Sequence, residues 1–465
     1  MRRSTSKLAA ALSAAWLCAL AAVGAAEPPR RLPLPDFRTI SPLLRASDPP
    51  APSGAPVAGT VSREQIDRWL QELDRAGLSP QDAGFVAGGI EYVFRNHVSP
   101  PLPEELLQGA IDGVARKLDP SSARYSAMKG VMEKLDRYSR FLNPQESARR
   151  SRGQAGQRTS DGMSFKRKIV GEPLVVDWVR PGSPAHAAGI REEDRITAVN
   201  GSDVVALGPE NVLSAFPEGA RVGARVVFRV QGAGRPDPVD VPVILEELRV
   251  DKAVGRRLGN VGYVHLGDFN ENSFEHLGAR LAALRAGPLD GLIVDLRGNG
   301  GGRDSNLMRI AAHFLPDRTH IMTGETRDET RMMTAMLQAG QVQLLGVPLV
   351  VLVDHETASA AEVLAAALQD HGRAVVVGTR TFGKFSGQST LRFNDGSTGV
   401  LTTDRWRSPR GRTVQGGLAP DVEVTISREA QASLSRILDD QLEGREIDLR
   451  SDPFVEAALA ALQRR

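Results

Sequence analysis

One serine stands where a nucleophile could be built. Ser359 follows a near-continuous apolar run at residues 348–354 after a short turn, and it opens an Ala-rich stretch that ends near residue 371. This pattern predicts a buried strand, a sharp turn and a helix that begins at the serine. A serine there can simply cap the helix, because its oxygen accepts a free backbone N–H. The place also suits a nucleophile, since free N–H groups and the positive helix end stabilise negative charge on a substrate carbonyl.

A serine nucleophile needs a base, and Lys384 is the first candidate. It lies between Phe382 and Phe385 among small and apolar residues. Burial there disfavours the ammonium and lowers its pKa from the ordinary ~10.4, and only the neutral amine can take a hydroxyl proton. Gln388 can hold that amine without adding a charge that would raise its pKa. An ordinary surface lysine is the simpler alternative.

A histidine base is the second candidate. His355 is close in sequence, and Asp354 or Asp370 could orient it in a Ser-His-Asp triad, as they could orient His371. The Gly-x-Ser-x-Gly string of such enzymes is missing around the serine. An isolated histidine in a turn is more often a polar surface residue, so the sequence favours the lysine.

A glycine-rich stretch follows another apolar run. Residues 291–295 predict a buried strand, and residues 295–302 read Asp-Leu-Arg-Gly-Asn-Gly-Gly-Gly before a helical pattern at 303–315. Glycines at such a turn let the backbone approach a ligand closely. A phosphate cradle is one interpretation, but the Gly-Lys-Ser/Thr ending of a P-loop is missing. A loop that donates N–H groups to an oxyanion or a substrate backbone fits better, with a plain tight turn as the alternative.

Together these stretches resemble the carboxyl-terminal processing peptidases, also called tail-specific proteases. That family carries its serine in a Ser-Ala-Ser-Ala-(Ser/Ala)-Glu run, which stands here as Thr-Ala-Ser-Ala-Ala-Glu at 357–362. A lysine follows 25 residues after the serine in a Thr-Phe-Gly-Lys string, and a glutamine follows four residues later. Family strings also match 295–302 and 409–421, so the resemblance covers about 81–424. Departures beside the lysine, and the absence of the usual proline in the string at 135–142, remove no catalytic group.

The resemblance implies a Ser-Lys mechanism and a fold. Lys384 accepts the proton as Ser359 attacks a peptide carbonyl, an acyl-enzyme forms, and water releases it. Gln388 orients the lysine, and the backbone N–H groups of Ala360 and of Gly301 or a neighbour form the oxyanion hole. Neither a metal nor an organic cofactor is required. The implied fold is an α/β protease core of βαβ type, crotonase/ClpP-like, with an inserted small β-rich PDZ domain and an N-terminal helical region.

Residues 160–248 carry the PDZ-like features. Short β-branched runs alternate with turn residues, and a PDZ-like string runs from 179 to 190. Successive backbone N–H groups of such modules hold a terminal carboxylate, while the peptide adds a strand to the sheet edge. We therefore expect this stretch to select substrates by their C-terminal residues or to gate the active site, with a purely structural β-domain as the alternative. Four residues stand where the carboxylate-binding loop is expected: Gly162, Met163, Ser164 and Phe165.

Length, net charge and cysteine content limit the classes of partner and chemistry that the chain can be expected to have. The chain has 465 residues, enough for two or three folded units, and its net charge of +2 gives no support for a nucleic-acid partner. Its one cysteine, Cys18, lies in the N-terminal apolar segment, so disulfides and thiolate chemistry are excluded from a mature chain. Protein or peptide substrates with free C-termini are the expected partners. The resemblance adds an adaptor or regulatory protein and a homodimer through the N-terminal helices.

The N-terminus has the pattern of a secretory signal. A basic start, an apolar run and the small residues at 23–26 predict a cleaved signal peptide and an exported, periplasmic protein. An uncleaved anchor that faces the periplasm is the alternative. Polar, basic residues at 147–159 predict a linker. The expected divisions are a signal peptide at 1–26, a Pro/Ala-rich linker at 27–62, a helical region at 63–150, a PDZ domain at 160–248, a Ser-Lys protease core at 249–425 and a C-terminal helical region at 426–465.

Three classes of function are therefore weighed. The first is a Ser-Lys endopeptidase that acts on exported proteins. The second is a non-catalytic PDZ adaptor that kept the protease fold, and the third is a Ser-His-Asp hydrolase. The presence of Ser359, Lys384 and Gln388 at the family's positions favours the endopeptidase.

Overall fold

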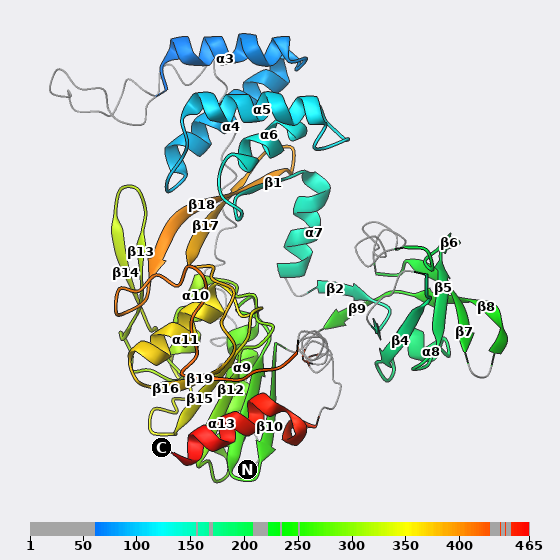
Figure 1. Cartoon of the computed structure of the whole chain (residues 1–465), viewed down its shortest axis with the longest axis vertical. Helices are drawn as coiled ribbons and strands as arrows, with labels where there is room; N and C mark the ends of the chain where they lie inside the picture. Colours follow the sequence, from blue (N-terminus) through cyan, green and yellow to red (C-terminus); the bar gives the residue numbers. More distant parts are fainter. Residues whose placement is uncertain are drawn as a thin grey trace, which may run out of the picture.

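The computed structural model has a helical bundle at one end, an α/β core at the other and a β-rich module to one side (Figure 1). It describes residues 61–154, 157–166, 171–207, 222–232, 235–249, 252–427, 438, 442 and 448–464. The signal peptide expected at 1–26 lies outside these residues, as does nearly all of the linker expected at 27–62. No helix within the described residues is long and apolar enough to cross a bilayer.

The core is built on a six-stranded sheet with the order β10-β11-β12-β15-β16-β19. Neighbouring strands from β11 to β19 are parallel, and β10 pairs antiparallel with β11 at one edge. The apolar runs predicted as strands at 291–295 and 348–354 form β12 and β15, which are buried along their whole length. The strands are β10 Ala253–Leu258, β11 Val261–Leu266, β12 Gly291–Asp295, β15 Leu349–Val353, β16 Ala374–Gly378 and β19 Val422–Glu423.

Helices cover both faces of this sheet. Alternate side chains of β15 point to opposite faces, so Val351 packs with one set of helices and Val350 with the other. The first set is α9 Ser273–Arg285, α10 Asp304–Ala311 and α11 Ala360–Asp370. The opposite face packs against α13 Pro453–Gln463, which follows a short 3-10 helix, η2 Leu449–Ser451.

The C-terminal helix is tied to the core by a buried charge network. Arg297 has no exposed surface, and its Nε donates to Asp295 Oδ1 at 2.9 Å. Its Nη1 donates to Asp452 Oδ1 at 3.1 Å, next to the start of α13. The Tyr263 hydroxyl also donates to Asp295, at 2.7 Å. A buried guanidinium needs such partners. Because Arg297 belongs to the glycine-rich stretch that follows β12, these bonds fix that stretch to the end of β12 and to the start of α13.

A second sheet joins the core to the helical bundle. Its strands have the order β1-β18-β13-β14, and β17 pairs with β18 in a long antiparallel hairpin. Phe385 and Trp406 pack at one end of this hairpin with the core, whereas Phe393 and Leu401 pack at the other end with the bundle. The strands are β1 Arg140–Leu142, β13 His320–Glu325, β14 Thr330–Thr334, β17 Ser386–Arg392 and β18 Thr398–Arg407.

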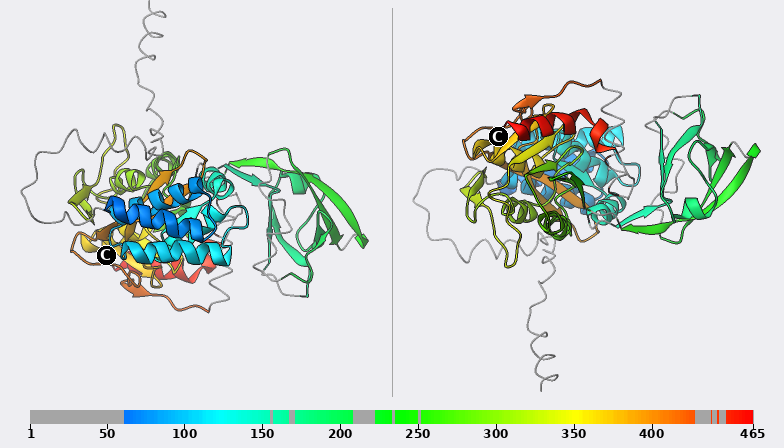
Figure 2. Two further views of the ribbon diagram at one scale, coloured as in Figure 1. Left: turned by 90° about the horizontal axis from the view of Figure 1, so that it is seen from above. Right: turned by 90° about the horizontal axis from the view of Figure 1, so that it is seen from below.

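Four helices form the bundle, which lies in front of the core in the left view of Figure 2. Ser62 and Ser79 cap the first two helices through their side-chain oxygens. The last two pack backbone to backbone through glycines, because a Cβ at Gly130 would lie 2.0 Å from Gly109 O. The helices are α3 Arg63–Arg75, α4 Pro80–Asn96, α5 Pro103–Arg116 and α6 Ala123–Glu133.

Two paired strands, β2 and β9, connect the β-rich module to the rest of the chain and form its neck. Strand β2 pairs antiparallel with β9, and these strands mark where the chain leaves for the module and where it returns (Figure 1). Apolar side chains of the module form a separate core around Val176, Ile196 and Phe228. Its elements are β2 Gln157–Ser160, β3 Met163–Phe165, β4 Leu174–Val179, α8 Pro184–Ala187, β5 Arg195–Val199, β6 Ser202–Asp203, β7 Arg225–Gly232, β8 Arg235–Ile244 and β9 Glu246–Arg249.

The linker prediction for residues 147–159 was wrong. Helix α7, Pro144–Gln154, occupies most of that segment, and β2 occupies its end. Asn143 and Glu146 form a reciprocal cap, since each side chain accepts the backbone N–H of the other, at 2.8 and 2.9 Å. Pro144 occupies the first turn, where its missing N–H costs nothing. Asn143, Pro144 and Glu146 thus mark the start of a helix, but they precede the polar residues at 147–159, whose composition indicated a linker instead.

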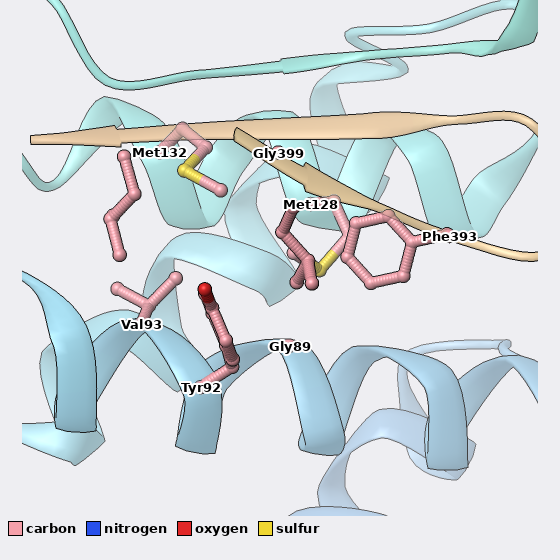
Figure 3. A pocket seen from close by; sticks show the side chains of 9 residues that line it. Gly89, Tyr92, Val93, Met128, Met132, Phe393 and Gly399 are labelled. Atoms are coloured by element: carbon pink, nitrogen blue, oxygen red, sulfur yellow. The ribbon is translucent and has the colours of Figure 1, made fainter. Parts of the chain in front are cut away.

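The contact between bundle and hairpin leaves a small apolar pocket (Figure 3). Gly399 of β18 lies on its wall, and a Cβ there would meet Met132 and Phe393 at 3.7 Å, an ordinary packing distance. We expect Gly399→Ala to raise the free energy of unfolding by about 0.5–1 kcal/mol, because it removes backbone entropy from the unfolded chain and fills space. The lining residues are Gly89, Tyr92, Val93, Met128, Met132, Leu391, Phe393, Gly399 and Leu401.

Gly130→Ala provides the opposite control, because its Cβ would collide with the backbone of α5. It should lower the free energy of unfolding by about 1–3 kcal/mol. Urea denaturation of both variants measures the two changes. A Gly399→Ala variant that is destabilised would mean that this wall cannot accept a methyl group.

Candidate active site

Ser359 lies at the sharp turn between β15 and α11. Its backbone is in an unusual conformation, with φ 58° and ψ −122°, and the residue is 6% exposed. Such a conformation costs about 1–3 kcal/mol in a non-glycine residue and is concentrated at functional sites. Within the described part of the chain, the Ala360 N–H that follows has no hydrogen-bond partner. The predicted strand, sharp turn and helix that begins at the serine are thus present, whereas the strained backbone of Ser359 was not predicted.

The turn before the serine is fixed by buried hydrogen bonds. The Asp354 carboxylate accepts the backbone N–H of Thr357 at 2.9 Å and that of Gly298 at 3.1 Å. The Thr357 hydroxyl donates to Leu296 O at 2.9 Å. The bonds to Gly298 and Leu296 join the turn to the stretch after β12.

The glycine-rich stretch lies directly against the serine. A Cβ on Gly301 would fall 2.8 Å from Ser359 Cβ and 2.9 Å from Ala360 N, closer than side chains tolerate. Gly301 therefore permits this approach and has φ 93°. Its own N–H donates to Asn299 Oδ1 at 2.8 Å. The structure thus brings Gly301 beside Ser359 and Ala360, although its N–H is already used.

Lys384 stands at the foot of the hairpin, just before β17, and is partly buried. Burial, together with the nearby charges of Arg140 and Arg150, lowers its pKa to about 8. Asp136 and Asp304 oppose this shift. A substantial fraction of the amine is therefore neutral near pH 8, as a general base requires.

The position of the lysine amine differs from the one that a working dyad requires. Among the described residues, no hydrogen bond joins Ser359 Oγ and Lys384 Nζ. The amine lies over the Tyr138 ring, 5.3 Å from its centre. The Gln388 amide, expected to orient the lysine, instead donates to Ser386 O at 3.0 Å and Ser386 Oγ at 3.1 Å.

A buried carboxylate that the sequence analysis did not single out joins the two loops. Glu362 of α11 has no exposed surface, and its Oε2 accepts the backbone N–H of Ser359 at 2.9 Å and that of Lys384 at 2.8 Å. Its Oε1 accepts the Gly383 N–H at 2.7 Å and the Thr381 hydroxyl. The signal was present in the sequence, because a Ser-x-x-Glu string is a capping box, but its bonds to the second loop are tertiary.

The histidine alternative finds no support in the arrangement. His355 is exposed, and His371 Nε2 lies 2.7 Å from His320 O. Asp370 accepts the Arg410 N–H at 3.0 Å and pairs with Arg412. No group of three or more His, Cys, Asp or Glu side chains in the described residues could hold a metal ion.

The predicted carboxylate-binding loop of the module lies at the start of β3. Met163, Ser164 and Phe165 form this strand, which pairs antiparallel with β4. Gly162 has φ 82° and lies so close to Ser183 that a Cβ would come within 2.1 Å of the Ser183 Cβ. The Gly162 N–H donates to Ser160 Oγ at 2.8 Å, and the Met163 N–H to Asp161 Oδ1 at 3.0 Å.

The Glu362 contacts predict a specific loss. Glu362→Gln replaces one acceptor oxygen by an amide that faces N–H donors, so buried donors stay unpaired at about 1–3 kcal/mol each. We expect the free energy of unfolding to fall by at least about 2 kcal/mol in urea denaturation. Glu356→Gln is the matched control, because Glu356 is exposed, and it should change stability by less than about 0.5 kcal/mol. Equal stability of the two variants would contradict this role of Glu362.

Comparison with known proteins identifies the family. Residues 260–424 match the model of peptidase family S41, and residues 175–226 match that of the PDZ domain. The carboxyl-terminal-processing protease of Synechocystis sp. is 30% identical over 318 residues, which are 67% of this chain and 73% of that protein. The carboxyl-terminal-processing protease of Picosynechococcus sp. is 31% identical over 314 residues, 66% of this chain and 74% of that protein.

Among solved structures, the photosystem II D1 C-terminal processing protease aligns over 79% of this chain and 99% of that one, with a TM-score of 0.48 and 25% identity. The resemblance drawn from the sequence motifs is thus confirmed by the two family models and the curated relatives. The chain belongs to the carboxyl-terminal-processing proteases of peptidase family S41, serine-type peptidases that act on protein substrates, and it carries a PDZ domain.

Proposed function

We propose that this chain is an endopeptidase in which Ser359 is the nucleophile and Lys384 is the general base. The observation that carries the proposal is the Glu362 carboxylate, which accepts a backbone N–H from each of these residues. A lysine with a pKa of about 8 is thereby held on a loop next to a strained serine. A strained serine backbone and a lysine with a lowered pKa are both typical of active sites, and their occurrence at one place therefore supports a catalytic role.

In this mechanism the neutral Lys384 amine takes the Ser359 hydroxyl proton as the oxygen attacks a peptide carbonyl. The C–N bond of the tetrahedral intermediate then breaks, the ammonium returns the proton to the leaving amine, and an acyl-enzyme remains. Water, deprotonated by the same amine, attacks the ester and releases the product. The chemistry uses side chains and backbone groups of this chain and needs no metal or organic cofactor.

The amine must leave the Tyr138 ring to reach the serine. The four-carbon stem of lysine rotates freely enough for this, and catalytic hydrogen bonds often form only when substrate is bound. In that conformation Gln388 would orient the amine. The free N–H of Ala360 would be one oxyanion donor, and the Gly301 stretch would supply the second after local adjustment, since the Gly301 N–H is bonded to Asn299.

We also propose the larger organisation of the enzyme. The parallel sheet with helices on both faces supports a crotonase/ClpP-like core at 249–425, and the neck of β2 and β9 supports a PDZ insertion at 160–248. Exported proteins would be the substrates, in the periplasm, after removal of a signal peptide at 1–26. We propose that the helices at 63–150 form a homodimer. An adaptor or regulatory protein is a further proposed partner. Nucleic acid is not among the proposed partners.

Three substitutions test the catalytic assignment on a casein-like substrate. Ser359→Ala and Lys384→Ala should each lower kcat/KM by several orders of magnitude, because nucleophile and base act as one unit. His355→Ala should leave kcat/KM within about twofold, since its side chain is exposed.

Other outcomes have equally clear meanings. Activity that survives in Lys384→Ala but is lost in His355→Ala would establish the triad instead. A folded parent protein that cleaves nothing, with or without cell-envelope extract, would favour the non-catalytic adaptor.

The second test concerns C-terminal selection. Amidation of a peptide substrate removes its carboxylate, and we expect KM to rise about 10- to 100-fold with little change in kcat, since hydrogen bonds to a charged group contribute about 1.5–3 kcal/mol. Gly162→Ala should raise KM for the free acid alone, because its Cβ would displace Ser183 and the loop. Gly171→Ala is the matched control, since Gly171 also has a positive φ but has no atom within 4 Å of a Cβ. Equal KM values for acid and amide would rule out selection through the carboxylate.

A further inference from the structure

Tyr138 links the helical bundle to the lysine loop. It lies between α6 and β1, and its hydroxyl donates to Gly383 O at 3.4 Å. Its ring centre lies 5.3 Å from Lys384 Nζ. The Arg137 guanidinium donates to the same hydroxyl and lies 4.8 Å from the centre of the Tyr138 ring and 5.1 Å from that of the Phe382 ring. One aromatic side chain thus contacts the lysine loop through both its hydroxyl and its ring.

The backbone of this segment is held rigidly from the bundle side. The Asp136 carboxylate accepts the Tyr138 N–H at 2.7 Å and pairs with His97 Nε2 at 2.8 Å, where α4 ends. The Thr402 hydroxyl of β18 donates to the same carboxylate at 3.1 Å. These bonds fix the Tyr138 segment to both α4 and the hairpin, so the Tyr138 ring has a defined position beside the lysine loop.

We propose that Tyr138 is a positioning residue for the catalytic lysine: its ring holds the charged amine against the bundle and releases it to Ser359 when the amine is neutral. The inference rests on the proposed function, because it takes Lys384 as the base. A ring face attracts an ammonium through its quadrupole but offers no such attraction to a neutral amine. The contact therefore selects the protonation state that cannot act as a base.

Charged groups from several elements face the same amine. Arg140 of β1 and Arg150 of α7 act with burial to lower the Lys384 pKa, whereas Asp136 and Asp304 raise it. Burial and the nearby Asp404 of β18 raise the pKa of Asp304 to about 6, so Asp304 becomes fully charged only above that pH. The ring acts in the same direction as these carboxylates. Its removal destabilises the ammonium, lowers the lysine pKa and makes the neutral base available at lower pH.

The test compares Tyr138→Leu, which removes the ring, with Tyr138→Phe, which keeps the ring and removes the hydroxyl. In the profile of kcat/KM against pH, the acid limb of Tyr138→Leu should move down by about 0.5 pH unit, and activity well below pH 8 should rise about threefold. Tyr138→Phe should keep the limb of the parent. An unmoved limb in Tyr138→Leu, or an equal shift in both variants, would overturn the role of the ring.

A measurement without turnover separates this inference from the proposed function. In a Ser359→Ala background, the Cε signal of ¹³C-labelled Lys384 can be titrated directly and assigned through Lys384→Gln, because the chain has only eight lysines. The Lys384 pKa should be lower in Tyr138→Leu, which lacks the ring, than in Tyr138→Phe, which retains it. Equal values would overturn the inference, whereas proteolysis that survives Lys384→Ala would overturn the proposed function.

Discussion

The site depends on one buried carboxylate whose oxygens must accept hydrogen bonds. Glu362 lies inside α11 without exposed surface, and a carboxyl group buried there needs hydrogen-bond partners for its oxygens. Donors come from two segments about twenty residues apart, the serine turn and the strip at 381–384. The foot of the β17–β18 hairpin must therefore return to the start of α11. Backbone hydrogen bonds to one carboxylate thus bring Ser359 and Lys384, the proposed nucleophile and base, to one place.

That hairpin also explains why helices far away in sequence bear on the site. Its core end packs through Phe385 and Trp406, and its outer end packs through Phe393 and Leu401 against the bundle. Strand β1 adds to β18 and brings Tyr138 with it. The bundle and the lysine loop are thus connected through a hydrogen-bonded hairpin that packs at both of its ends.

The local structure around the site could be predicted from the sequence, but most of its tertiary contacts could not. The strand, turn and helix around Ser359 were predictable, because apolar periodicity and helix start signals are local. The glycine-rich stretch predicted that the backbone approaches a ligand closely, and only the family resemblance indicated that Gly301 lies near the serine. The contacts of Glu362 and Tyr138 were not predictable, since they join segments up to 245 residues apart. Helix α7 was missed because a polar composition masked the cap formed by Asn143 and Glu146.

The neck of the PDZ module has a consequence for how such enzymes diversify. Register places Gln157 opposite Arg249 and Ser160 opposite Glu246, so the module leaves and rejoins the chain at adjacent points. To the rest of the polypeptide, the whole module is equivalent to a hairpin turn. Its length and content can change by recombination while the two ends stay where they are, and the catalytic scaffold need not refold around the exchange. A different module can thus be inserted at this point without any change to the protease core.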